Sequence, residues 1–385
     1  MPVMESIVKE ALGKAKKPAP QKKLEVRRRE VKGSDSDEEL RRVIDGIKTS
    51  IKVIGCGGAG SNTIERIAEM GLDSGDIIAV NTDALHLFYC KAPVKVLIGA
   101  ALTGGVGAGN DPAVGEKCAE SDIEKLAEVL SGADMIFATC GLGGGTGTGG
   151  IPVIAQVAKD MQALTIAIVT LPFTVEGRVR ASNALRGLRK LKKFADTVIV
   201  IPNDRLLDIA PNLPLNTAFK VADEVLANSV KGITETITKP GLVNVDFADV
   251  RTIMKEGGTA MIGFGESRKD TSKEERAMES VEKALTSPLL DTDISNARGV
   301  LIDITGSKDM TLEEAELIVR TVAERIDPDA EIIWGAHIDE ELEQNVVKTF
   351  VILSGVKVPG YEEKLAESVE GAGDDGYDAT GLKYV

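Results

Sequence analysis

Short apolar runs alternate with helical patterns through the first half of the chain. The first run, 51–54, is followed by glycines and by a helical pattern that places Ile64 and Ile67 on one face. Similar runs occur at 77–80, 94–98, 135–139, 164–171 and 197–201. Uninterrupted apolar runs are typical of parallel strands covered on both faces, so the alternation predicts an α/β domain with a parallel sheet. Ligands of such sheets bind at the carboxyl ends of the strands, where the glycines fall.

The second half of the chain has a different pattern. A long helical pattern over 215–237 stops at Lys239-Pro-Gly241, because proline and glycine end a helix. Longer strands follow at 260–265, 299–305, 331–337 and 346–353, with helical patterns near 247–256, 272–285 and 311–325. We expect a smaller mixed-sheet α+β domain, joined to the parallel-sheet domain by the long central helix.

Composition narrows the class of protein. The 385 residues include 40 glycines but only 8 Phe, 4 Tyr and 1 Trp, and the net charge is −14. No apolar run approaches the ~20 residues that span a bilayer, and residues 1–17 lack the apolar core of a secretory signal. The acidic body and the shortage of aromatic side chains argue against nucleic-acid binding. We therefore expect a soluble, cytoplasmic protein.

The cysteines and histidines predict neither a disulfide framework nor a metal site. Four scattered cysteines form no Cys-x-x-Cys pair: Cys56, Cys90, Cys118 and Cys140. Only His86 and His337 add imidazole, which argues against a nitrogen and sulfur metal centre. We predict no metal-ligating side chains.

Three glycine-rich loops carry the candidate chemistry. Gly55-Cys-Gly-Gly-Ala-Gly60 matches the dinucleotide pattern G-x-G-x-x-G and has Asp83 23 residues beyond it, so an NAD-dependent oxidoreductase is one interpretation. Tight helix–strand packing is the structural alternative. The other loops are 103–109 and 143–149. A dinucleotide fold needs one such loop, whereas three place many backbone N–H groups around a polyphosphate. The chain has no G-x-x-x-x-G-K-[ST] motif and no Asn-Lys-x-Asp guanine reader, so it is not a P-loop NTPase.

The motifs around these loops resemble those of one family. Gly143-Gly-Gly-Thr-Gly-Thr-Gly149 is the signature of the tubulin/FtsZ superfamily. Other motifs follow in family order: Asn81-Thr-Asp-Ala, Pro172-Phe-x-x-Glu-Gly, Ile201-Pro-Asn-Asp and Gly241-Leu-x-Asn-Val-Asp-Phe-Ala-Asp249. The chain is thus similar to the FtsZ family of cell-division GTPases, and to its archaeal members, over about residues 50–355. The resemblance implies a tubulin-like GTP-binding domain related to the Rossmann fold.

The resemblance also implies a set of nucleotide contacts. Phosphate and ribose would be bound by the first loop, the γ-phosphate side by the second, and further phosphate by the signature loop. These positions are Gly58, Ala59, Gly60, Ser61, Asn62, Ala108, Gly109, Gly145, Thr146 and Gly147. Ribose would be bound by Glu176 and Arg180, whose i, i+4 spacing places them on one helix face; a surface ion pair is the plainer interpretation.

Guanine would be read by Asn203, Phe219 and Asp223 in this family. A carboxylate that accepts from guanine N1–H and from the exocyclic amine suits a choice of G over A. By their pattern alone, Phe219 is a core residue of the long helix and Asp223 a solvated one. The ligand would be GTP or GDP, with Mg²⁺ held mainly by phosphate oxygens and water.

Catalysis in this family would fall to Asp246 and Asp249, assisted by Asn244. The plainer interpretation makes Asp246 a helix N-cap and Asp249 a first-turn acid. The resemblance implies that these carboxylates complete the site of the next subunit in a head-to-tail filament, so that hydrolysis requires polymerisation. A non-hydrolysing FtsZ-like regulator is a further alternative.

The resemblance and the charge distribution together predict an organisation of the chain. Residues 1–33 hold ten Lys or Arg against four acids, and residues 360–385 hold seven acids against two lysines. We expect a mobile basic extension over 1–37, a GTP-binding domain with a leading helix over 38–226, a connecting helix over 215–239, a C-terminal GTPase-activating domain over 240–358 and an acidic tail over 359–385. Either terminal segment is a candidate docking site for a membrane-tethering division protein, and a plain solubilising or frayed end is the alternative. The family places such a protein at the division site, on the inner face of the membrane.

Overall fold

The computed structural model of the chain describes residues 49–72, 75–209, 214–239, 241–268, 270–290, 292–340 and 342–357. The basic extension, the leading helix and the acidic tail that we predict therefore lie outside the described residues. Among the described residues, no helix has the length and apolar character needed to cross a membrane.

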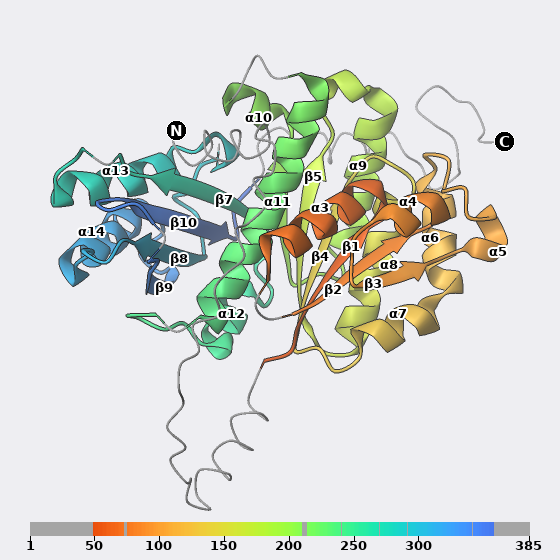
Figure 1. The fold of residues 1–385 in the computed structure, drawn as a ribbon, viewed down its shortest axis with the longest axis horizontal. Helices are drawn as coiled ribbons and strands as arrows, with labels where there is room; N and C mark the ends of the chain where they lie inside the picture. Colours follow the sequence, from red (N-terminus) through yellow and green to blue (C-terminus); the bar gives the residue numbers. More distant parts are fainter. Residues whose placement is uncertain are drawn as a thin grey trace, which may run out of the picture.

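Six parallel strands form the sheet of the first half of the chain (Figure 1). Their order is β3-β2-β1-β4-β5-β6. Their bounds are β1 Ile51–Cys56, β2 Asp76–Asn81, β3 Val94–Leu97, β4 Met135–Gly141, β5 Leu164–Leu171 and β6 Thr197–Pro202. β5 is buried along its whole length, as expected for a strand with helices on both faces. The predicted parallel-sheet α/β domain is confirmed.

Four longer strands form the second half of the sheet. They are β7 Gly258–Glu266, β8 Gly299–Gly306, β9 Glu331–Ile338 and β10 Val347–Ser354. β10 pairs antiparallel with both β7 and β8, while β8 and β9 are parallel. This is the mixed sheet that the sequence predicts.

The two halves share one continuous ten-stranded sheet, which the sequence pattern does not reveal. β7 pairs with β6 in parallel through three register positions, beginning with Thr197 opposite Gly258. Two glycines allow this junction: a Cβ on Gly257 would lie 2.4 Å from Thr197 Oγ1, and Gly258 has a φ of +66°. The link between the halves is therefore a sheet junction as well as a helix.

Helices cover both faces of the sheet (Figure 1). One face packs against α6 Pro112–Ser121, α7 Ile123–Leu130, α8 Thr146–Asp160, α9 Arg178–Leu191, α13 Lys273–Leu285 and α14 Leu312–Ala323. The other packs against α3 Gly57–Met70, α4 Ala84–Tyr89, α10 Asp204–Ile209, α11 Leu215–Thr238 and α12 Phe247–Met254. Short pieces complete the described chain: α5 Ala100–Thr103, and the 3₁₀ turns η1 Thr174–Glu176 and η2 Pro288–Leu290.

The central helix α11 spans 24 residues, or about 36 Å at 1.5 Å per residue. Its buried side chains share one core with strands from both halves, including Ile199 of β6 and Ile352 of β10. The predicted connecting helix is present, and it lies along the sheet between the two halves (Figure 1).

Candidate functional site

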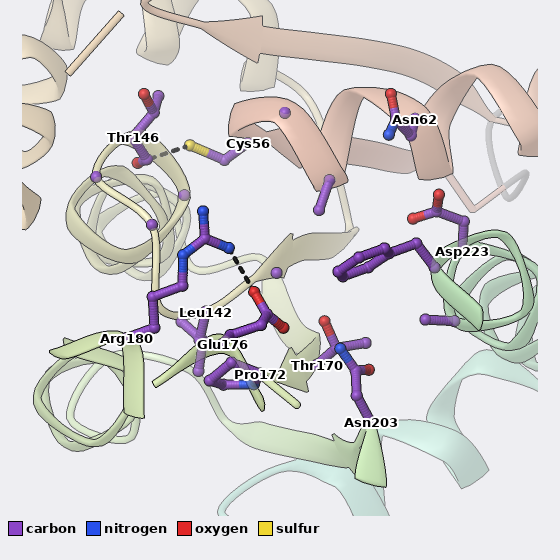
Figure 2. Close-up of a pocket in the computed structure, with 18 of the residues that line it drawn as sticks. Cys56, Asn62, Leu142, Thr146, Thr170, Pro172, Glu176, Arg180, Asn203 and Asp223 are labelled. Atoms are coloured by element: carbon purple, nitrogen blue, oxygen red, sulfur yellow. Dashed lines mark hydrogen bonds and ion pairs between the residues drawn. The ribbon is translucent and has the colours of Figure 1, made fainter. Parts of the chain in front are cut away.

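A cavity of about 390 Å³ opens at the carboxyl ends of β1, β4, β5 and β6 (Figure 2). Eleven of the predicted nucleotide-binding residues line it: Gly58, Ala59, Asn62, Gly145, Thr146, Gly147, Glu176, Arg180, Asn203, Phe219 and Asp223. They come from segments far apart in the sequence. The structure therefore gathers most of the predicted set around one space.

The signature loop ends at the N-terminus of α8. Gly145 is the N-cap residue and no side chain caps the helix, so its first backbone N–H groups are left without an intrahelical partner. Gly143 has a φ of +111°, which favours glycine, and a Cβ on Gly144 would meet nothing within 4 Å. A helix N-terminus of this kind is an anion site, because its amides and its dipole both favour negative charge.

The two threonines of the signature loop have different surroundings. Thr148 is buried, and its hydroxyl accepts a hydrogen bond from Gly143 N at 2.8 Å, which closes the loop on itself. Thr146 lines the cavity, and its hydroxyl lies 2.7 Å from that of Thr82. Of the two threonines of this loop, Thr146 is therefore the one that lines the cavity.

The first loop divides between the cavity and the core. Gly58, Ala59 and Asn62 line the cavity, whereas Gly60 and Ser61 are buried behind it. A Cβ on Gly60 would lie 2.8 Å from the carbonyl oxygen of Thr139, so this glycine allows α3 to pack on β4. For Gly60, the alternative interpretation of the G-x-G-x-x-G pattern, tight packing of a helix on a strand, is therefore correct.

The second loop lies behind the signature loop and outside the cavity lining. Ala108 is buried, and its Cβ lies 2.9 Å from the position that a Cβ on Gly145 would take. Gly109 is exposed, with a φ of +58°. These two predicted residues therefore support or flank the signature loop in this structure.

Glu176 and Arg180 form an ion pair at the cavity (Figure 2). The expectation that they share one helix face is wrong, because Glu176 ends η1 and Arg180 belongs to α9. Gly177, with a φ of +94°, separates the two elements. Glu176 is also held by the backbone N–H of Phe173, which donates to it at 2.8 Å.

A polar and aromatic wall closes the far side of the cavity. Asn203 is buried, yet its Oδ1 has no hydrogen-bond partner within the described residues. Phe219 is 38% exposed and packs edge-on against Phe173, with ring centroids 5.2 Å apart. A buried acceptor without a partner is costly, so this wall is suited to a ligand with N–H donors.

Asp223 faces the cavity from α11, opposite Asn62 of α3 (Figure 2). Burial raises the pKa of its carboxyl to about 7, and the charge of Glu224 adds to the rise, while hydrogen bonds from Thr63 and Asn62 oppose it. The solvated carboxylate expected from the helical pattern alone is therefore wrong.

Some residues that line the cavity were not among the predicted site residues. His86, Thr170, Leu142 and Cys56 also border the cavity. Strand ends account for Cys56 and Thr170, which the rule of carboxyl ends would have found. His86 lies on a six-residue helix with no useful periodicity, so no local signal marks it.

The three predicted catalytic residues lie together in another part of the molecule. Asp246 caps α12 by accepting from Asp249 N at 2.9 Å, and Asp249 accepts in return from Asp246 N at 3.1 Å. Asn244 Oδ1 accepts from Gly241 N at 2.6 Å. The helix-cap interpretation of the two acids is thus confirmed; Asp246 is exposed and Asp249 is half-buried.

These acids are remote from the cavity of their own chain. Asp223 lies in the first half of α11, and Asn244 follows the other end of that helix, beyond Thr238. The fifteen residue steps from Asp223 to Thr238 correspond to about 22 Å along the helix axis. Asp246 and Asp249 therefore do not line the cavity of their own chain.

A parallel sheet with a glycine signature loop at its carboxyl edge defines the class of tubulin-like GTPases. Residues 50–211 match the Tubulin/FtsZ family, GTPase domain, and residues 258–357 match the FtsZ family, C-terminal domain. The chain belongs to the FtsZ family. It is thus a tubulin-like GTPase whose ligand class is guanine nucleotide.

Relatives from archaea support the same assignment. The chain is 60% identical over 326 residues to the cell division protein FtsZ of Methanothermobacter thermautotrophicus, covering 85% of this chain and 84% of that protein. It is 53% identical over 356 residues to cell division protein FtsZ 1 of Archaeoglobus fulgidus, covering 92% and 94%. Among solved structures, an empty FtsZ dimer of M. jannaschii has 53% identity and a TM-score of 0.78, covering 84% of this chain and 93% of that one. The predicted family and fold are confirmed, and these findings give the oxidoreductase alternative no support.

Proposed function

We propose that the cavity binds GTP and GDP through the residues that the sequence predicts. Phosphates lie at the free N-terminus of α8, against Gly145, Thr146 and Gly147, because that helix end offers amides without partners. Gly58 adds space, since a Cβ there would meet nothing within 4 Å, and the loop that carries Ala108 supports the γ-phosphate side. The paired Glu176 and Arg180 border the ribose.

Guanine lies between Asn203, Phe219 and Asp223. The unpartnered Oδ1 of Asn203 is the observation that carries this assignment, because a base with N–H donors satisfies it. The Asp223 carboxylate, when ionised, accepts from guanine N1–H and from the exocyclic amine. Adenine presents no donor at its N1 position, so the same carboxylate favours guanine.

Mg²⁺ fits this cavity only as a companion of the nucleotide. No group of three or more His, Cys, Asp or Glu side chains that could hold a metal occurs in the described part of the chain. The donors near the phosphate end are hydroxyls, those of Thr146 and Thr82. A cation there would be held mainly by phosphate oxygens and water, and it would offset phosphate charge.

Hydrolysis takes place between two subunits of a head-to-tail filament. The separation of Asp246 and Asp249 from their own cavity supports this proposal, because the acids need the phosphates of a neighbouring copy to act upon. The carboxylates then polarise the attacking water, with Asn244 beside them, and catalysis consists of positioning and electrostatics. A GTP-binding domain over 38–226 and an activating domain over 240–358 correspond to the two poles of such a subunit.

Such filaments form the cell-division ring at mid-cell, on the inner face of the membrane. The names of the archaeal relatives support this cellular role. A membrane-tethering division protein would attach the filament through a terminal segment of the chain.

The shared site is tested by Asp249→Asn together with Asp249→Ala. Asparagine keeps an oxygen that accepts from Asp246 N, whereas alanine removes this reciprocal bond together with the charge; in both variants Asp246 still caps α12 through the backbone N–H of residue 249. Both variants should bind GTP and assemble like the wild type, and both should lose at least about a hundredfold in phosphate release. Sedimentation with GTP and calorimetric binding of GDP provide the two other readouts.

Two results would contradict the proposal. Loss of GTP binding by the folded Asp249→Asn variant would place this residue in the cavity of its own subunit. Specific GTPase activity of the wild type that stays flat with protein concentration, while filaments form, would show that the site is complete in one chain.

A further inference from the structure

His86 connects two loops at the edge of the cavity. It lies on α4, directly after the Asn81-Thr-Asp-Ala segment that ends β2, and it borders the cavity. Its Nδ1 lies 3.0 Å from Asn81 Nδ2, and its Nε2 lies 3.2 Å from Asn62 Oδ1. Both ring nitrogens are thus engaged by side chains from different elements, β2 on one side and α3 on the other.

The direction of these hydrogen bonds follows from Asn81. Its Oδ1 accepts from the backbone N–H of Thr82 at 2.9 Å and from that of Asp83 at 3.3 Å, so its Nδ2 is the donor toward His86. His86 Nδ1 is then an acceptor, and the ring proton lies on Nε2 and is donated to Asn62 Oδ1. The backbone of one loop thereby selects the tautomer of the imidazole.

The orientation of the Asn62 amide makes this side chain a hydrogen-bond donor to Asp223. Because the Oδ1 of Asn62 accepts from His86, its Nδ2 is the donor, and a hydrogen bond from this side chain to Asp223 opposes the rise that burial causes in the pKa of that carboxyl. Asn62 itself is exposed, so without His86 its amide is free to rotate or to turn into solvent. Each hydrogen bond in this series is therefore donated in the same direction. Asn81 donates to His86, His86 donates to Asn62, and Asn62 donates to the Asp223 carboxylate.

We propose that His86 is a positioning residue for guanine recognition: it fixes Asn62, and Asn62 holds the Asp223 carboxylate toward the base. This inference rests on the proposed role of Asp223. His86 would thus affect the base indirectly, through Asn62. It also predicts that nucleotide specificity depends on the short helix α4, outside the glycine loops.

The test compares His86→Leu with His86→Gln. Leucine removes both hydrogen bonds, whereas glutamine carries an acceptor and a donor about as far apart as the two imidazole nitrogens. Phe88→Ala, on the same helix and 74% exposed, is the matched control. Calorimetry with GDP and with IDP, whose base lacks the exocyclic amine, measures affinity and discrimination in one experiment.

We expect His86→Leu to bind GDP roughly tenfold more weakly, the effect of one lost hydrogen bond that supports a charged group. IDP binding should fall less, because IDP offers Asp223 one contact fewer. His86→Gln should recover most of the GDP affinity, and Phe88→Ala should match the wild type. In saturating GTP, kcat of the assembled His86→Leu variant should be unchanged while KM rises.

Equal losses of GDP and IDP affinity in His86→Leu would show a merely structural effect and would overturn the inference. Unchanged GDP affinity in His86→Leu would overturn it as well. The proposed function beneath it is tested separately by Asp223→Ala. If Asp223→Ala abolishes the preference for GDP and His86→Leu has no effect, only the role of His86 is wrong. If Asp223→Ala keeps the wild-type preference, the assignment of Asp223 is wrong.

Discussion

Asp223 combines a half-buried position with a carboxyl that faces the cavity. Burial raises its pKa to about 7, so protonated and ionised forms are both populated near neutral pH. Only the ionised form accepts from both donors of guanine. In the proposed complex, binding of the base therefore competes with protonation of Asp223.

We predict that GDP affinity falls as the pH drops through 7. Because bound guanine stabilises the carboxylate, the dissociation constant should rise by up to about tenfold per pH unit below 7 and level off above it. Calorimetry in buffers of different ionisation enthalpy should also detect proton release on binding near pH 7. Asp223→Asn is the control, since it cannot titrate; a wild-type pH slope in that variant would assign the effect to another group.

Individual site residues were predictable only through the resemblance. Periodicity alone makes Phe219 a core residue and Asp223 a surface residue, because helical pattern carries no information about a cavity that strands from elsewhere create. Gly60 illustrates the opposite case, since its packing against Thr139 was available as the plain structural reading. The role of His86 depends on contacts to two separate elements, which no local pattern contains.

At the scale of elements, the strands were the most predictable part of the molecule. Leu164–Leu171 has the predicted bounds, and the predicted helix over 215–237 corresponds to Leu215–Thr238. Buried parallel strands read as unbroken apolar runs, so their ends are sharp in the sequence. The break between η1 and α9 was missed, because Gly177 acts through a positive φ that the i, i+4 pattern conceals.

Two helices of the second half are joined by a buried arginine. Arg276 of α13 is fully buried and pairs with Glu314 of α14, which is itself buried; Asp309 and Asn345 complete its hydrogen bonds. A second, more exposed pair joins Glu282 of α13 to Arg325, in the turn just after α14. This arrangement provides a buried and an exposed ion pair in one local setting.

We predict that Arg276→Ala lowers the free energy of unfolding by about 3–5 kcal/mol, because it leaves the Glu314 charge buried and unpaired. Arg325→Ala, the matched control, should cost less than about 1 kcal/mol. Equilibrium unfolding in urea measures both values. Similar losses for the two variants would mean that burial does not decide the strength of these pairs.

At the scale of the whole molecule, the continuous sheet is the feature that sequence patterns do not predict. Each strand is marked by its own residues, but the pairing of β6 with β7 is a property of two distant segments. The pairing depends on Gly257 and Gly258. Glycines are common before strands, so these two residues alone do not indicate a sheet junction. The division into two halves was therefore predictable, and their junction was not.

We predict that both halves unfold together, because they share the sheet junction and the core beneath α11. Trp334 of β9 is the single tryptophan and reports on the second half, while release of a fluorescent GDP analogue reports on the first. The two signals should change at the same urea concentration. Two separate transitions would show that the halves are independent folding units.

The positions of the cavity and of the Asp246–Asp249 cap at opposite ends of α11 have a consequence for assembly. If each complete site needs one pole from each of two subunits, a filament always has one fewer complete site than it has subunits. One terminal subunit holds nucleotide that no neighbour can attack, and the other presents acids with nothing to act upon. In the proposed filament the two tips would therefore be chemically different, and average turnover per subunit would grow with filament length toward a plateau. The orientation of a single helix would thus give the proposed polymer a direction.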